Sequence, residues 1–150
     1  MTPRFHGVTL AALVLAIGTA YAAPADQVRA RIAGFRELGA AFKAVNDGLR
    51  GEVSPVLIQQ SARQIRNAAR QQYAWFPAGT GPQPGLKTAA KALIWAKPAQ
   101  FKAAQDNFAR QADAFQKAAA GGNVATIRAE ARKLGATCKA CHDTFRVPAD

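Results

Sequence analysis

The sequence VRARIAGFRELGAAFKAVNDGL, residues 28–49, decides the fold class. Its large apolar residues recur every seven positions, with a second apolar set between them. The first set is Val28, Phe35, Phe42 and Leu49, and the second is Leu38 and Val45. A heptad pattern of this kind places one apolar stripe on a helix and predicts that the stripe packs against other helices. Asp26 is the predicted N-cap, and Asn46, Gly48 and Gly51 are expected to end the helix.

Three further amphipathic helices are predicted downstream. The second begins at Ser54-Pro55, where serine supplies an N-cap and proline suits the first helical position. The third begins at Pro98 and ends at Gly121-Gly122, and the fourth follows the N-cap Asn123. The predicted core positions of the second and third helices are Leu57, Ile58, Ile65, Ala68, Ala69, Tyr73, Phe101, Phe108 and Phe115.

A segment rich in proline and glycine, PAGTGPQPG at 77–85, separates the second helix from the third. Its composition excludes regular structure, so we expect a crossing loop, followed by a short helix from Leu86 to Trp95. The other two connections are short. Four amphipathic helices joined in this way predict an all-α fold, an antiparallel four-helix bundle. Long connections are often functional, and this one is expected to cover an edge of a bound group.

The motif Cys138-Lys139-Ala140-Cys141-His142 lies near the end of the fourth helix. On a helix, its two cysteines and its histidine stand at i, i+3 and i+4 and therefore share one face. Two thiols at this spacing can bond to the two vinyl groups of one porphyrin, while the imidazole reaches the iron. The motif predicts a c-type haem attachment site, in which Cys138 and Cys141 hold haem c covalently and His142 binds its iron.

Two other interpretations of the cysteines are weaker. A redox-active disulfide of the CxxC type is expected within a βαβ pattern, which this helical sequence lacks. A zinc site usually needs four ligands, and the only histidine besides His142 is His6, in a segment predicted to be removed. A haem-free bundle with a thiol site is kept as a third interpretation.

Residues 1–22 are predicted to form a cleaved signal peptide. Arg4 gives a positive start, 8–16 is a nearly unbroken apolar run too short to span a bilayer, and Ala20-Tyr21-Ala22 has the form of a cleavage site. The mature domain would then be residues 23–150, located in the periplasm. A retained membrane anchor is the alternative.

The chain carries 20 basic and 9 acidic residues, a formal net charge of +11. Such a charge suits nucleic acid, but the basic residues are spread along every segment and no nucleic-acid motif is present. We therefore expect no nucleic-acid partner. A basic surface can instead steer an acidic redox partner or favour an anionic membrane.

The apolar stripe of the first helix contains one charged residue, Arg31, in register with Leu38 and Val45. In one interpretation it lies near the open end of the bundle and extends its guanidinium to water. In the other, the guanidinium pairs with a haem propionate, since guanidinium binds carboxylates well. The sequence leaves both open.

With these features the sequence resembles the cytochrome c′ family of four-helix-bundle haem proteins. The resemblance covers nearly all of residues 23–150 and is most specific in 138–143 with the following Phe145-Arg146; Arg31, the crossing loop and Ile94-Trp95 are weaker shared features. The resemblance implies one role for each matching residue. These are thioether bonds to haem c from Cys138 and Cys141, proximal iron ligation by His142, a place beside that ligand for Arg146, a place near the propionates for Arg31, and a distal position over the iron for Phe35.

The distal position decides the ligand chemistry. Relatives with methionine there are low-spin electron carriers, but the only methionine here is Met1, and Phe35 cannot bind iron. Lys43 is a formal candidate, but it lies about two turns further along and would have to be deprotonated. We therefore expect five-coordinate, high-spin iron with a vacant apolar sixth site. A low-spin electron-transfer cytochrome of the same fold is the alternative.

A vacant apolar site favours small uncharged ligands. NO and CO bind ferrous iron without a hydrogen-bond donor, whereas bound O₂ gains from one. The resemblance implies NO binding, with sequestration or detoxification as its use, and it allows a homodimer through the first two helices. No acid–base pair is evident beside the haem, so an enzyme is not expected.

Overall fold

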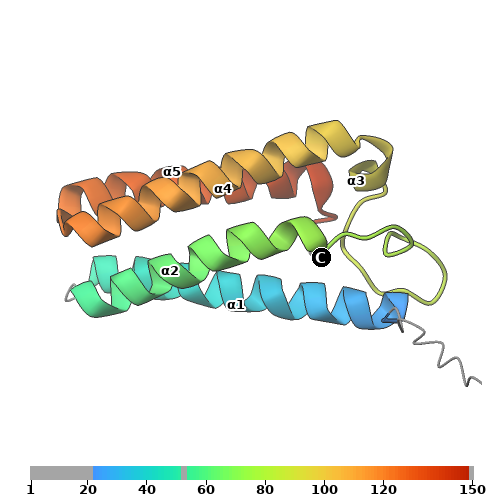
Figure 1. The fold of residues 1–150 in the computed structure, drawn as a ribbon, viewed down its shortest axis with the longest axis horizontal. Helices are drawn as coiled ribbons and strands as arrows, with labels where there is room; N and C mark the ends of the chain where they lie inside the picture. The colour runs from blue at the N-terminus through green and yellow to red at the C-terminus, as the bar shows by residue number, and fades with distance from the viewer. Residues whose placement is uncertain (1–21, 52–53, 149–150) are drawn as a thin grey trace, which may run out of the picture.

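The computed structural model describes residues 22–51 and 54–148, so nearly all of the predicted signal peptide lies outside the described residues. Four long helices run alternately up and down as an antiparallel bundle (Figure 1). They are α1 (Pro24–Arg50), α2 (Pro55–Gln71), α4 (Pro98–Gly121) and α5 (Val124–Phe145). Two short elements, η1 (Gln72–Ala74) and α3 (Leu93–Ala96), lie between α2 and α4. The predicted four-helix bundle is confirmed.

Capping residues explain most of the helix ends. The side chain of Ser54 accepts a hydrogen bond from the Leu57 amide, and that of Asn123 accepts one from the Thr126 amide. Gly122 follows α4 at a φ of 72°, a left-handed conformation that glycine adopts without strain. The prediction for the start of α1 was wrong. Proline suits the first helical position, so α1 begins at Pro24 and Asp26 lies in the first turn.

The main core fills the centre of the bundle with aliphatic and phenylalanine side chains from all four long helices. Its fully buried large members are Val45, Ile58, Ile65, Phe115 and Leu134. Two predicted core positions were wrong, because Leu57 and Tyr73 are each 41% exposed. Leu57 lies in the first turn of α2. Tyr73 lies in the 3₁₀ turn η1, whose tighter winding rotates it off the helical stripe.

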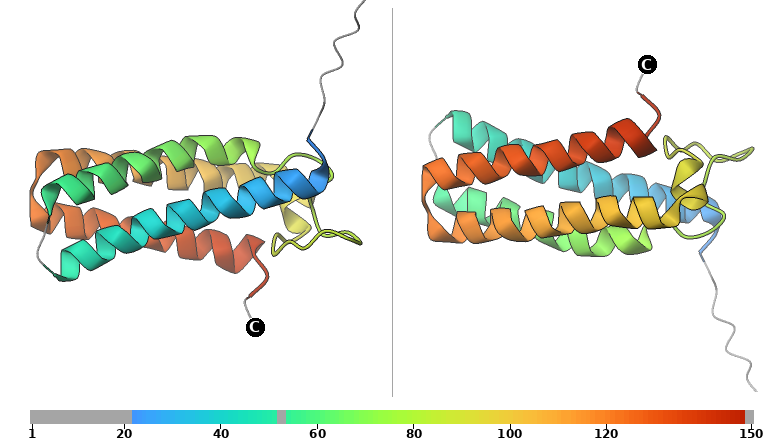
Figure 2. Two further views of the ribbon diagram at one scale, coloured as in Figure 1. Left: turned by 90° about the horizontal axis from the view of Figure 1, so that it is seen from below. Right: turned by 90° about the horizontal axis from the view of Figure 1, so that it is seen from above.

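The connection between α2 and α4 closes one end of the bundle. The short helix predicted over 86–95 is confined to α3, Leu93–Ala96, because the residues before it pair with the end of α5. The Lys91 amide donates to the Phe145 carbonyl at 2.9 Å, and the Val147 amide donates to the Ala89 carbonyl at 2.8 Å. Both views of Figure 2 show the last turn of α5, in red, beside this connection. None of the described helices is long and apolar enough to span a membrane.

Candidate functional site

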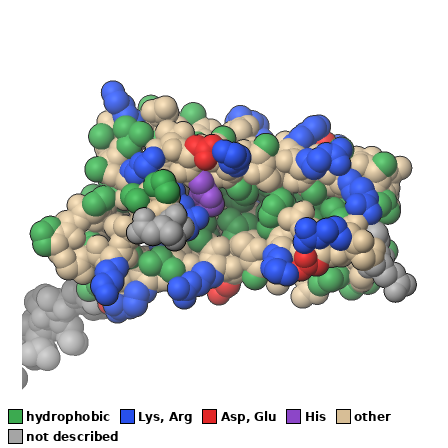
Figure 3. Space-filling view, turned by 180° about the vertical axis from the view of Figure 1, so that it is seen from behind, with side chains coloured by type: hydrophobic (Ala, Val, Ile, Leu, Met, Phe, Trp, Pro, Cys, Tyr) green, Lys and Arg blue, Asp and Glu red, His purple; other side chains and the backbone are tan. Residues whose placement is uncertain are grey.

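A cavity of about 620 Å³ lies between the helices, at the half of the bundle next to the crossing connection. Figure 3 shows a hollow on the surface here, lined with hydrophobic side chains, and the purple histidine at its edge is His142, the one histidine among the described residues. Cofactor pockets typically measure about 300–1,000 Å³ and are mostly apolar. The apolar lining includes Phe35, Leu38, Phe42, Phe76, Phe108 and Leu134.

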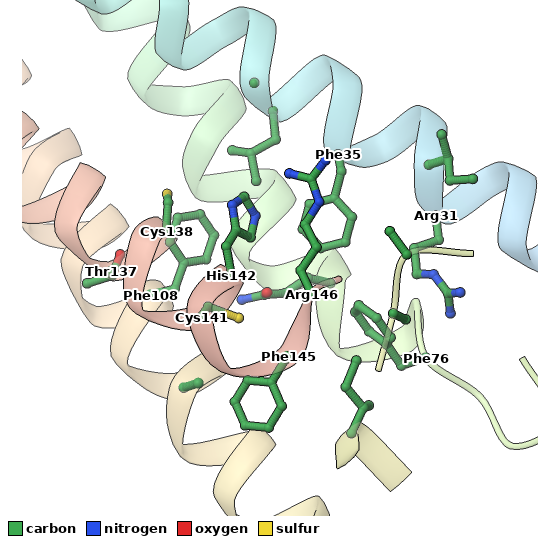
Figure 4. Close-up of a pocket in the computed structure, with 18 of the residues that line it drawn as sticks. Arg31, Phe35, Phe76, Phe108, Thr137, Cys138, Cys141, His142, Phe145 and Arg146 are labelled. Atoms are coloured by element: carbon green, nitrogen blue, oxygen red, sulfur yellow. The ribbon is translucent and has the colours of Figure 1, made fainter. Parts of the chain in front are cut away.

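The two cysteines and the histidine of the motif line this cavity from the last turns of α5, as their helical spacing predicted (Figure 4). Both cysteines are half-buried free thiols. Burial raises the pKa of Cys138, and burial together with the nearby Cys138 raises the pKa of Cys141 to about 11. Redox-active CxxC thiols have lowered pKa values. These two thiols therefore do not suit disulfide exchange.

The imidazole of His142 lies at the exposed edge of the cavity. Partial burial lowers its pKa, the positive charge of Arg146 lowers it further, and Asp143 acts in the opposite direction. A lower pKa favours the neutral imidazole, which is the form that binds a metal. The described part of the chain contains no group of three or more His, Cys, Asp or Glu side chains that could hold a metal ion, so the zinc interpretation has no ligand set there.

Aromatic rings form one wall of the cavity. The ring of Phe35, on α1, stands edge-on to Trp75 with centroids 4.8 Å apart and lies 6.0 Å from Phe76. The series continues from Phe76 to Phe101 at 4.8 Å and from Phe101 to Phe145 at 5.1 Å. The wall therefore runs from α1, opposite the motif, to the last residue of α5 (Figure 4).

Arg31 lines the same cavity, but its guanidinium does not reach water. The side chain is buried, at 3% exposure, so the first interpretation of this residue is wrong. Its guanidinium donates to the Trp75 carbonyl, to both the hydroxyl and the carbonyl of Thr80, and to the Thr88 hydroxyl, at 2.8–3.2 Å. It also stacks 4.7 Å from the centre of the Phe76 ring. Arg31 thus holds the crossing loop against α1.

Lys43, the formal alternative iron ligand, lies outside the cavity. Its ammonium pairs with Asp47 on the surface, and its side chain is 76% exposed. The helical positions of α1 that line the cavity are Arg31, Ile32, Phe35, Arg36, Leu38, Gly39 and Phe42. None of these side chains is an ordinary iron ligand, and Lys43 is not among them.

Gln72 and Arg36 are among the cavity residues that the sequence analysis did not single out. Gln72 is buried in the wall, where it and Gln105 each donate from their side-chain amide to the other's backbone carbonyl, at 3.4 and 3.2 Å. Gln105 lies between Phe101 and Phe108 on the apolar stripe, so a polar residue at that position was the available signal. Arg36 also lines the cavity, and its only signal was its place next to Phe35.

The size, the apolar lining and the two neutral thiols beside an imidazole fit a covalently attached haem c. Fold and site together therefore define the class of c-type haem proteins built on a helical bundle. Comparison with known proteins agrees with this class. The family model described as Cytochrome C' matches residues 26–146. The cytochrome c' of Rhodopseudomonas palustris is 33% identical over 144 residues, which cover 92% of this chain and 93% of that protein.

Other relatives align over a shorter region. The cytochrome c' of Pararhodospirillum photometricum is 44% identical over 72 residues, 47% of this chain and 55% of that protein. This alignment and that to the Rubrivivax gelatinosus protein, at 53%, thus span about half the length of those relatives.

Solved structures share the fold. The nitric oxide complex of a mutant cytochrome c prime from Alcaligenes xylosoxidans has a TM-score of 0.77 at 26% identity, covering 85% of this chain and 99% of that one. A cytochrome c' with ligand-controlled dimer dissociation has a TM-score of 0.82 at 24% identity, covering 86% and 100%, and supports the fold alone. The chain belongs to the cytochrome c′ family, and its cofactor is covalently bound haem c.

Proposed function

We propose that this protein is an exported haem protein with five-coordinate, high-spin iron, which binds small uncharged ligands such as NO and CO on its open distal side. Haem c supplies an iron that can take up such a ligand and change between two oxidation states. In this proposal Cys138 and Cys141 hold the haem by thioether bonds, and His142 is the one protein ligand of the iron. Their common face on α5 and their place at the cavity support these roles.

The observation that carries the proposal is the chemistry of the cavity opposite the motif. Phe35, Leu38 and Phe42 present only hydrocarbon to it from α1. The polar side chains Arg31 and Gln72 are engaged in hydrogen bonds with the protein itself. Apart from Arg36, which lies exposed at the mouth of the cavity, the residues that α1 contributes offer neither an iron ligand nor a free hydrogen-bond donor. Uncharged NO and CO therefore suit the site better than O₂, which gains from a donor.

The residues around the motif tune the proximal side. Partial burial, and after it the positive charge of Arg146, lower the pKa of His142, which favours the neutral imidazole that can bind iron. Arg31 and Phe35 complete the haem environment as parts of the cavity wall. A mutant of the related Alcaligenes xylosoxidans protein has been solved as a nitric oxide complex, which supports the same ligand class here.

Export is part of the proposal. Cleavage after Ala22 would leave the mature chain starting at Ala23, one residue before α1 begins at Pro24, so the cut would spare the whole bundle. The exported protein would be periplasmic, and it would be basic. Its charge suits an acidic redox partner protein.

Absorption and electron paramagnetic resonance spectra of the purified protein test the proposal. We expect a high-spin ferric spectrum and ferrous adducts with NO and with CO. His142→Ala should keep the haem in the mass spectrum but lose the parent's ferric spectrum. Asp143→Asn, at the exposed neighbour, is the matched control and should keep it. A low-spin ferric spectrum at neutral pH would select the electron carrier instead, and a protein of apoprotein mass without a Soret band would select the thiol interpretation.

A further inference from the structure

Haem brings two propionate carboxylates to its site, and each needs a cation or water. Three guanidinium groups line the cavity, those of Arg31, Arg36 and Arg146. The resemblance assigned the propionates to Arg31.

Arg31 has few donors left for a carboxylate. Of its five N–H groups, four are aimed at the crossing segment, since the two terminal nitrogens each donate to two oxygens, on Trp75, Thr80 and Thr88. A bidentate pairing with a carboxylate would require breaking at least one of these bonds. Leaving the buried Thr80 carbonyl without a partner costs free energy. Arg31 is therefore committed to the loop.

The loop bonds of Arg31 also reach the motif helix. Thr88 accepts from Arg31 and in turn accepts from the Ala90 amide at 3.1 Å. The adjoining backbone of Ala89 and Lys91 pairs with Val147 and Phe145, at the end of α5 and just beyond it. One continuous set of hydrogen bonds thus joins α1 to the end of α5.

The two other guanidinium groups are exposed at the mouth of the cavity. Arg146 follows His142 by one helical turn, its amide donates to the His142 carbonyl at 3.0 Å, and both residues line the cavity, so Arg146 belongs to the side of the motif helix. Arg36 lies on α1, directly after Phe35. Among the described residues it has no ion pair, whereas Arg29, Lys43 and Arg50 of the same helix all have one.

Given the haem site proposed above, we infer that Arg36 is the guanidinium of α1 that pairs with a haem propionate, while Arg31 is a positioning residue that fixes the crossing loop to α1. This assigns a carboxylate-binding role to Arg36 and divides two functions between neighbouring arginines of one helix. Arg31 holds the crossing loop in the cavity wall, and Arg36 neutralises one propionate of the haem.

The test measures the pKa of the haem propionates in the ferric holoprotein by proton NMR of the haem methyl groups against pH. A nearby guanidinium stabilises the carboxylate, so Arg36→Gln should raise one propionate pKa by about 0.5–1 unit, less than for a buried pair because the site is exposed. Arg36→Lys should keep most of the parent's value, since it keeps the charge. Arg29→Gln, on the same helix and outside the cavity, is the control and should change nothing.

The role of Arg31 has a separate readout. Arg31→Lys cannot serve four acceptors with one ammonium, so the loop should loosen and tryptic cleavage after Lys87 should accelerate at least severalfold in the holoprotein, as it should in Thr88→Val. Arg36→Gln should neither loosen the loop nor speed the cleavage after Lys87. An unchanged propionate pKa in Arg36→Gln, or a rise in Arg31→Lys alone, would overturn the assignment. A protein without haem would instead contradict the proposed function.

Discussion

Replacement of Phe35 by alanine gives a quantitative test of distal access. If Phe35 occupies the distal position that the resemblance implies, a ligand that approaches the iron from α1 must move its ring. That ring makes two aromatic contacts, with Trp75 at 4.8 Å and with Phe76 at 6.0 Å between centroids. Each such pair contributes about 0.5–1.5 kcal/mol, so displacing the ring costs about 1–3 kcal/mol.

This cost sets the expected change in rate. A barrier lower by about 1.4 kcal/mol is a tenfold acceleration, so Phe35→Ala should speed CO association with the ferrous protein by about 5- to 150-fold. Flash photolysis of the CO adduct measures the rate directly. The thermal stability of the variant, followed by circular dichroism, shows whether the bundle itself survives the loss of the ring.

The matched control is Phe42→Ala. Phe42 is half-buried, lies on the same helix and lines the same cavity, but forms no ring pair with Trp75 or Phe76. We expect its replacement to alter the CO rate by less than about twofold. Equal rates in Phe35→Ala and the parent would refute the distal role of Phe35. An acceleration seen only in Phe42→Ala would place the distal residue two turns further along α1.

Two other predictions concern packing and the thiols. A Cβ on Gly34 would lie 2.6 Å from Trp75 Cζ2, so Gly34→Ala should lower the free energy of unfolding by about 1–3 kcal/mol. A Cβ on Gly48 meets only Ile58, at 3.8 Å, so Gly48→Ala should raise the free energy of unfolding by about 0.5–1 kcal/mol. Thermal denaturation measures both, and equal effects of the two substitutions would contradict the prediction. In haem-free protein, the raised pKa of Cys141, about 11, leaves little thiolate at pH 8. Its alkylation there should be about 100-fold slower than that of a free cysteine and should accelerate up to about pH 11, and rapid labelling at pH 8 would show that the thiol is not buried.

Features governed by neighbours within one or two helical turns were predictable. The caps Ser54 and Asn123, the glycine stop at Gly122 and the shared face of the motif all depend on local hydrogen bonds and on the 3.6-residue period of the helix. The same locality explains the errors. Asp26 was a good cap by composition, but Pro24 starts the helix earlier, and Tyr73 kept the period of α2 while the backbone changed to a 3₁₀ turn.

The amino-acid sequence alone determined the four amphipathic helices, the antiparallel bundle and the attachment motif, because periodicity and capping are written into adjacent residues. Only the tertiary structure decided the partners of Arg31, which lie 44 to 57 positions further along the chain, and the pairing of Gln72 with Gln105 across 33 positions. A guanidinium satisfies whichever oxygens the folded chain brings within reach. Its role was therefore settled by the path of the crossing loop, which no local pattern in the helix encodes.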